Sequence, residues 1–204
     1  MAKRPTNSVF INCPFDDEFA PGFQALIFAI IRCGFQVRCA REMADGGETR
    51  IDKLYNIIEQ CRFGIHDLSR TELDAANHLP RFNMPLELGL FLGAKRYGDK
   101  SQKAKRCAIM DVEPFRYQRF ISDLNGMDIH VHGGDPRRMV EHVRTFLMTT
   151  SGRQTIPGLV ELLDSYDRFI VALPTLAAPF NPNPLQVIYP DFERLAINWT
   201  QAGL

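Results

Sequence analysis

The chain has 204 residues, of which 45% are apolar and 24% are charged, and its 24 basic and 24 acidic side chains give no net charge. This length allows one domain with a sizeable core and a short additional segment, while the neutral charge argues against a general nucleic-acid or anionic-membrane surface. No run of about 18 apolar residues occurs, and no apolar segment follows the basic residues of MAKRPTNSV. We therefore expect neither a transmembrane helix nor a secretory signal.

The five cysteines are spaced without a CxxC pair, and four of them lie in or beside apolar runs. This pattern favours reduced, partly buried thiols over disulfides or a zinc site, and it predicts a cytoplasmic protein. His130 and His132 are two residues apart and should share one face of a strand, but they lack a third ligand nearby. We expect no metal.

The first two-thirds of the chain alternate between short apolar runs and amphipathic stretches. This alternation predicts an α/β fold with three layers, in which helices cover both faces of a parallel sheet. The expected strands are residues 8–13, 35–39, 62–68, 106–112 and 128–131. The expected helices are residues 19–32, a helix capped by Thr49 and running past Ile58, and residues 85–97, 114–124 and 136–148.

The alternation stops near residue 150. Helices are expected at 158–170 and 190–201, with a segment rich in proline and asparagine between them at 173–184. We therefore divide the chain into an α/β domain, residues 1–150, and a helical C-terminal extension, residues 151–204. The extension should pack on the sheet domain or on a second subunit.

Ligands of open parallel sheets bind outside the carboxyl ends of the strands. The segments that follow the predicted strands are residues 14–18, 41–48, 69–83 and 113–117, with a turn at Asp45-Gly46-Gly47 and an unusually long connection at 69–83. The carboxylates near these segments are Asp16, Asp17, Glu18, Asp45, Glu48, Asp67 and Glu87. A site for a small polar ligand is expected here.

Glu87 is the most informative of these carboxylates. It is predicted in the first turn of a helix that starts at Pro85, between apolar neighbours. The carboxylate is partly desolvated there, but the nearby positive end of the helix dipole favours its ionised form. Gly89 would leave room for a flat ring or a ribose. An anion beside a sugar's anomeric carbon stabilises an oxocarbenium ion or attacks it. The alternative is a glutamate that only complements the helix dipole.

Asp67 ends a predicted buried strand, where a charge is unfavourable without a partner. It would bind ribose hydroxyls or orient Glu87; alternatively, it caps the following turn. Asp16 and Asp17 would line a pocket that Phe15 covers, or they cap the first helix. No dinucleotide fingerprint, Walker sequence or hydrolase elbow is present.

Three segments resemble known families. SVFINCPFDDEFAPGFQALIFAIIRCGFQVRCA and ADGGETRIDKLYNIIEQCRFGIHDLS are similar to the opening strands, loops and helices of TIR (Toll/interleukin-1 receptor) domains. FNMPLELGLFLGAKRYG looks more like the helix of nucleoside 2-deoxyribosyltransferases that carries the nucleophilic glutamate. The resemblance covers about residues 7–148. It departs from TIR enzymes at Met84-Pro85, where these often have Trp-Cys.

The resemblance implies a flavodoxin-like sheet and an enzyme that cleaves an N-glycosidic bond. Glu87 falls on the catalytic glutamate and Asp67 on the acid near the ribose. NAD is the expected substrate, with no cofactor, and the products are nicotinamide and ADP-ribose or a cyclic nucleotide. In bacteria such TIR-like enzymes commonly serve antiviral defence, often as oligomers. The remaining substrate-binding residues are expected to be Phe15, Asp16, Asp17, Asn12, Arg50 and Asn83.

Two other functions stay open. One is a nucleoside or nucleotide 2-deoxyribosyltransferase or hydrolase, and the other is a non-catalytic module that binds a nucleotide signal or assembles through TIR-like surfaces. Arg50 would meet a diphosphate, or it is a surface charge. We expect a nucleotide as the small-molecule partner, a homo-oligomer, and no partnership with nucleic acid or membrane.

Overall fold

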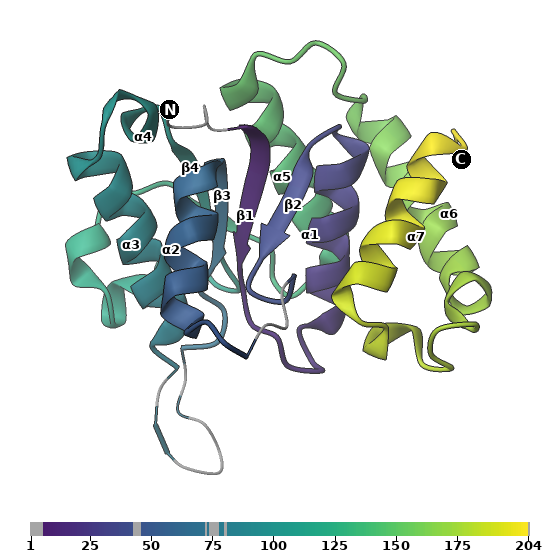
Figure 1. Ribbon diagram of the computed structural model, residues 1–204, viewed down its shortest axis with the longest axis horizontal. Helices are drawn as coiled ribbons and strands as arrows, with labels where there is room; N and C mark the ends of the chain where they lie inside the picture. The colour runs from purple at the N-terminus through teal and green to yellow at the C-terminus, as the bar shows by residue number, and fades with distance from the viewer. Residues whose placement is uncertain (1–5, 43–45, 72, 74–77, 80, 204) are drawn as a thin grey trace. The chain divides into compact units, whose positions relative to one another are not determined.

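The computed structural model (Figure 1) describes residues 6–42, 46–71, 73, 78–79 and 81–203. Five strands form one parallel sheet in the order β2-β1-β3-β4-β5, which is the flavodoxin-like order. The predicted α/β class is therefore confirmed. The strands are β1 Thr6–Asn12, β2 Gln36–Cys39, β3 Cys61–Asp67, β4 Arg106–Asp111 and β5 Ile129–Val131.

The α-helices follow the predicted order with one addition, α4, and one omission, the helix expected at 114–124. They are α1 Ala20–Arg32, α2 Arg50–Gln60, α3 Asn83–Tyr97, α4 Lys100–Lys103, α5 Pro136–Ser151, α6 Leu159–Ala177 and α7 Tyr189–Gln201. The Thr49 side chain caps α2 by accepting from the Asp52 amide, as expected. None of the helices in the described part of the chain is both long and apolar enough to cross a membrane.

Three expectations about helices are wrong. Residues 114–124 form two 3₁₀ helices, η1 Arg116–Arg119 and η2 Ser122–Leu124, and Phe115 precedes η1 in the left-handed region with φ 60°. Residues 98–104, where the sequence predicts no helix, contain the short helix α4, because the Asp99 carboxylate caps its first amides. Helix α6 continues to Ala177 through Pro174 and shortens the predicted irregular segment, which also contains η3 Pro184–Gln186.

The chain forms two compact units. Unit 1 comprises Met1–Pro14 and Arg38–Gly133, and unit 2 comprises Phe15–Val37 and Gly134–Leu204. Unit 2 therefore joins α1 and α5 to the helices beyond residue 150, whereas the sequence assigns α1 and α5 to the α/β domain. The division at residue 150 stays a prediction.

Helix α1 is the centre of unit 2. It packs against α5, α6 and α7, and its residues from Gly22 to Ile31 are all buried. The Phe28 ring stacks on Phe169 of α6 with centroids 4.9 Å apart, and Phe169 meets Trp199 of α7 edge-on at 5.5 Å. The C-terminal helices thus build their own core on α1.

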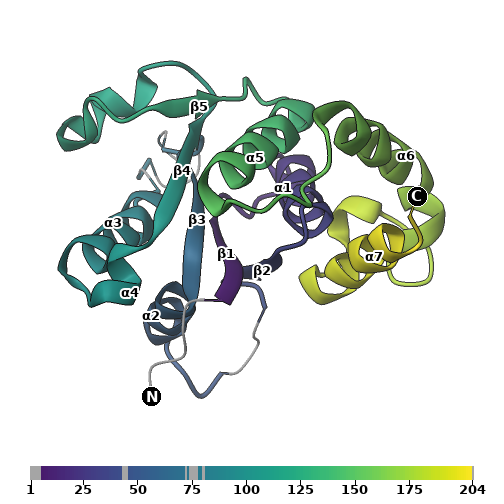
Figure 2. The same cartoon turned by 90° about the horizontal axis from the view of Figure 1, so that it is seen from above.

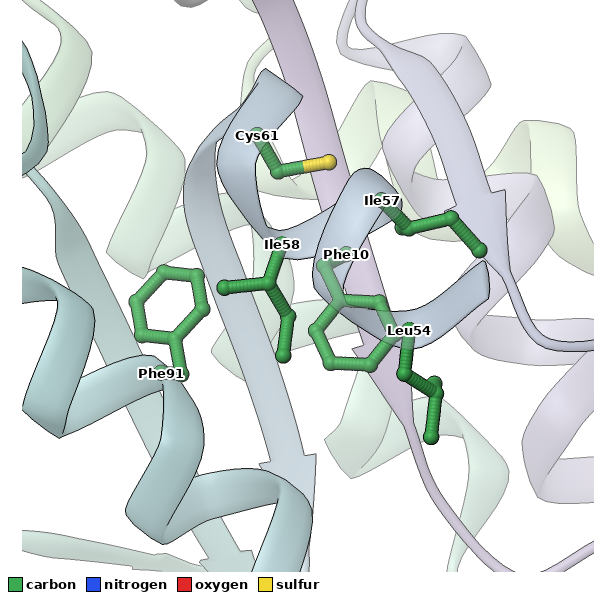
Figure 3. Close-up of a cluster of buried hydrophobic side chains, with 6 residues drawn as sticks. All are labelled: Phe10, Leu54, Ile57, Ile58, Cys61 and Phe91. Carbon is green, nitrogen blue, oxygen red and sulfur yellow. The ribbon is translucent and has the colours of Figure 1, made fainter. Parts of the chain in front are cut away.

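Helices α2 and α3 lie side by side in unit 1 and cover one face of β1 and β3 (Figure 2). Residues two apart on a strand share a face, so Phe10 and Asn12 of β1 point the same way as their register partners Gly64 and His66. The apolar cluster on this face consists of Phe10, Leu54, Ile57, Ile58, Cys61 and Phe91 (Figure 3). It fixes α2 and α3 against the sheet.

A buried lysine borders this cluster. Lys105 has no exposed surface, and its Nζ donates to the Ile58 carbonyl at 2.5 Å and to the Cys61 carbonyl. The Nζ also lies 4.8 Å from the centre of the Phe91 ring. Burial lowers the pKa of Lys105 to about 8. Lys105 thereby satisfies carbonyls at the junction of α2 with β3.

The cysteines in the described residues are all free thiols, as the sequence predicts. Four of them are buried and one is half-buried; the five are Cys13, Cys33, Cys39, Cys61 and Cys107.

Gly64 tests the packing of α3 on the sheet. A Cβ at Gly64 would lie 2.9 Å from Phe91 Cζ and 2.7 Å from His66 Nε2, whereas a Cβ at Gly93 of α3 would meet nothing within 4 Å. Gly64→Ala should therefore lower the free energy of unfolding by about 1–3 kcal/mol. Gly93→Ala, the matched control, should leave it unchanged or raise it by up to about 1 kcal/mol. Urea titration measures both; equal stability of the two variants would contradict the described packing.

Candidate active site

Glu87 lies two residues deeper in its helix than the sequence suggests. Helix α3 begins at Asn83 and not at Pro85, so Glu87 is in the second turn and the first turn holds no acidic residue. The effect of a helix dipole falls off within the first turn. The dipole therefore contributes less to the ionisation of Glu87 than predicted, and side-chain surroundings decide it.

Burial dominates those surroundings. The Glu87 side chain is only 5% exposed, and its Oε1 lies 3.5 Å from Nη2 of Arg50, whose side chain is 59% exposed. Burial raises the pKa of Glu87 to about 7, and the Arg50 guanidinium opposes part of that rise. The expected preference for the ionised form is therefore corrected: near neutral pH this carboxyl group exists in both forms.

A pocket of about 220 Å³ opens beside Glu87 between the first turns of α2 and α3. Three of the predicted site residues come together here, because the starts of the two helices lie side by side. The lining consists of Arg50, Ile51, Leu54, Asn83, Leu86 and Glu87. Small-molecule pockets usually measure about 300–1,000 Å³, so this pocket matches one ring-sized group.

Asn12 fixes the start of α3 and does not line the pocket. Its Nδ2 donates to the Met84 carbonyl at 2.8 Å and lies 3.0 Å from Nδ1 of His66. His66 is buried between the Phe10 and Phe91 rings, and burial, followed by the charge of Lys105, lowers its pKa to about 3. The last residue of β1 therefore positions the helix that carries Glu87.

Asp67 is fully buried and engages other partners. As the residue after His66 it points toward the opposite face of the sheet. Its Oδ1 accepts from the Ser69 amide at 2.9 Å, and its Oδ2 lies 3.0 Å from Nε2 of His132. Burial raises the pKa of the Cys13 thiol, and the charges of Asp67 and Glu87 add to the rise.

Ser69, His132 and Asp67 do not form a hydrolytic triad. The Ser69 hydroxyl oxygen also lies 3.0 Å from Nε2 of His132. In a triad the serine and the carboxylate engage different nitrogens of the imidazole, whereas here both face the same one. The three buried side chains instead tie the end of β3 to the segment after β5.

A buried ion pair lies at the end of β4. Arg116 Nη2 donates to Asp111 Oδ1 and to the Leu68 carbonyl, both at 2.6 Å. Burial raises the pKa of Asp111, and Arg116 opposes this rise. These contacts hold the ends of β3 and β4 together at the carboxyl edge of the sheet.

The predicted residues of the first loop belong to unit 2. Asp16 accepts from the Phe19 amide at 3.0 Å, and the Phe15 ring meets Phe23 of α1 edge-on with centroids 5.1 Å apart. Asp16 thus stabilises the turn that precedes α1 and does not cap the helix itself. The Asp17 carbonyl accepts a hydrogen bond from the Ala20 amide. A role of Phe15, Asp16 and Asp17 in a nucleotide pocket stays a prediction. Asp45, in the second loop, lies outside the described residues.

The Arg50–Glu87 pair and the role of His132 are absent from the sequence-based predictions. Arg50 was expected to meet a diphosphate or solvent, and the only available signal for its pairing was its place at the start of the helix before α3. Among the described residues no cluster of three or more His, Cys, Asp or Glu side chains is arranged to hold a metal. Neither family models, nor curated proteins, nor solved structures match this chain.

The pH dependence of folding tests the burial of Glu87. Its pKa is raised to about 7 in the folded state, above the ordinary value of 4.5, so the folded state binds the proton more tightly. Stability should therefore fall as pH rises from about 4.5 to about 7 and stay lower above that range. Glu87→Gln removes this dependence. The free energy of unfolding of Glu87→Gln relative to wild type should therefore rise by about 2 kcal/mol between pH 5 and pH 8.

Urea titrations at the two pH values measure this difference. Glu141→Gln, the same substitution at an exposed position of α5, controls for the loss of one negative charge. An unchanged stability difference between wild type and Glu87→Gln across this range would show that Glu87 is hydrated in the folded protein.

Proposed function

We propose that this protein cleaves an N-glycosidic bond and that NAD is its substrate. The observation that carries the proposal is a glutamate, buried in the second turn of α3, that faces a ring-sized pocket beside a single guanidinium. A carboxylate with little hydration responds strongly to a positive charge that develops next to it, because solvent screens it poorly. The resemblance of the α3 segment to deoxyribosyltransferases supports the same role for Glu87.

The reaction begins with the ribose of NAD beside the ionised Glu87. The bond between C1′ and the nicotinamide nitrogen breaks, and its electron pair stays on that nitrogen, which neutralises the pyridinium ring. The Glu87 carboxylate stabilises the oxocarbenium ion at C1′ or forms an ester with it. Water then attacks C1′ and loses a proton, which gives ADP-ribose; attack by an atom of the same molecule gives a cyclic product.

The surroundings of Glu87 fit a cationic leaving group. Nicotinamide leaves without protonation, so only the ionised form of Glu87 is needed. Asn83 and Arg50 line the pocket and are the groups that would contact the ribose and the phosphates. The Asp67 carboxylate has no exposed surface. To bind ribose hydroxyls it would first have to give up its contact with His132 or with the Ser69 amide.

The wider setting is part of the proposal. Free thiols and a nucleotide substrate favour a cytoplasmic protein. Unit 2 offers helices for assembly into a homo-oligomer, and resemblance to TIR-like enzymes favours a role in antiviral defence.

The test is incubation of the protein with NAD and, separately, with deoxynucleosides, followed by chromatography with mass detection. Wild type should release nicotinamide, and Glu87→Gln should lose about 100-fold or more of the turnover. With NAD, kcat/KM should rise with pH through about 7 and then level off, because the ionised carboxylate is the active form. The mass of the second product identifies hydrolysis or cyclisation.

Other outcomes separate the alternatives. Base release from deoxynucleosides alone would assign the protein to deoxyribosyltransferases or nucleoside hydrolases, for which a protonated Glu87 is a suitable acid toward the leaving base. Nucleotide binding without turnover, retained in Glu87→Gln, would indicate a sensor. Nicotinamide release that persists in Glu87→Gln would contradict the role of Glu87.

A further inference from the structure

A second and larger pocket runs along the same two helices that flank Glu87. It has a volume of about 670 Å³ and is lined by the turns of α2 and α3 that follow those of the smaller pocket. Leu54 and Glu87 line the smaller pocket, and Tyr55 and Gly89 line the larger one. The full lining is Tyr55, Ile58, Glu59, Gly89, Leu90, Gly93, Ala94, Tyr97, Gly98, Asp99 and Gln102. We call this pocket the α2–α3 groove.

Two glycines give the α2–α3 groove its depth. Gly89 and Gly93 are one turn apart on α3, and a Cβ on either would meet no atom within 4 Å. Glycine in the interior of a helix lowers helix stability by about 1 kcal/mol relative to alanine. Ile58, which also lines the groove, belongs to the buried apolar cluster with Phe10 and Phe91 (Figure 3). The open space is therefore backed by a rigid core.

The charges and rings of the α2–α3 groove select the occupant. Glu59 and Asp99 are acidic, and the lining residues that the structure describes include no lysine or arginine, so a phosphate is disfavoured there. Tyr55 and Tyr97, both largely exposed, offer aromatic faces to a planar ring. An uncharged heteroaromatic base with its ribose fits these properties, because carboxylates accept hydrogen bonds from amino and hydroxyl groups.

The length and the position of the one cation agree with this occupant. From Glu87 to Tyr97 an α-helix extends about 15 Å, which suits a molecule made of two linked nucleosides. Among the described residues that line the two pockets, Arg50 is the one cationic side chain, and it lies beside Glu87. A diphosphate that joins the two nucleosides would have one of its two negative charges balanced there.

We propose that the α2–α3 groove binds the second nucleoside of a dinucleotide whose reacting ribose lies at Glu87. This inference rests on the proposed function and adds a specificity subsite to it. The distal base lies over Gly89 and Gly93 between the two tyrosines. The subsite supplies binding energy for whole dinucleotides, which a nucleoside with a single base cannot use.

The test fills the α2–α3 groove. Gly93→Leu places a side chain in open space at a helical position, so the fold should persist, and Gly93→Ala is the smaller control. Gly93→Leu should raise KM for NAD about tenfold or more, a loss typical of a filled subsite. Its kcat/KM for nicotinamide riboside, which lacks the second nucleoside, should stay within about twofold of wild type. Equal effects on both substrates, or none on NAD, would overturn the assignment.

A binding measurement separates this inference from the proposed function. Adenosine binding is followed by ligand-observed NMR on Glu87→Gln protein with and without Gly93→Leu. Binding that Gly93→Leu abolishes supports the α2–α3 groove even if NAD is not cleaved. Absence of adenosine binding overturns the subsite, whether or not NAD is cleaved. The proposed reaction is then tested separately by nicotinamide release. A change in oligomeric state on Gly93→Leu, seen by light scattering with KM unchanged, would show that a second copy covers the groove.

Discussion

The burial of the Glu87 carboxylate next to Arg50 is the interaction on which the rest of the site depends. Apolar side chains of α2 and α3 remove Glu87 from water, and the compensating guanidinium lies 3.5 Å away on a side chain that is itself 59% exposed. A partner so well hydrated offsets only part of the desolvation of the ion. The pKa of Glu87 therefore rises to about 7. The folded protein holds a carboxyl group that is less stable as an anion than it would be in water.

The remainder of unit 1 keeps this arrangement in place. Asn12 holds the first turn of α3 through the Met84 carbonyl, and Gly64 lets the Phe91 ring approach the sheet closely. Lys105 satisfies carbonyls where α2 ends and β3 begins. These contacts act on both helices that carry the Arg50–Glu87 pair. The distance between the two side chains thus follows from the packing of α2 and α3, and not from an independent interaction at the surface.

The sequence predicts much of the fold because its apolar periodicity is strong. The apolar run at β1 and the Thr49 cap of α2 are found as expected, since their local signals agree with their packing. Local signals fail at residues 114–124, where the left-handed backbone of Phe115 and the contacts of Arg116 with β3 and β4 replace a regular helix. The start of α3 was predicted at Pro85, which is two residues too late, because proline is tolerated throughout the first turn of a helix.

Site residues were harder to place than strands. Glu87 stands out in the sequence as an acid among apolar residues, whereas its pairing with Arg50 joins positions 37 residues apart and depends on how two helices pack. Asp67 was expected beside Glu87, but strand alternation directs it to the opposite face, where His132 meets it. Such pairings require the strand order and the register, which periodicity alone does not supply.

The most direct measurement is the titration of the Glu87 carboxyl carbon by ¹³C NMR, with Glu87→Gln used to assign the resonance. We expect a midpoint near pH 7, as burial of this group predicts. Replacement of Arg50 by Met should move the midpoint higher, because the guanidinium favours the anion. A midpoint near 4.5, unchanged in the Arg50→Met variant, would show a hydrated surface glutamate and contradict the desolvation of this carboxylate.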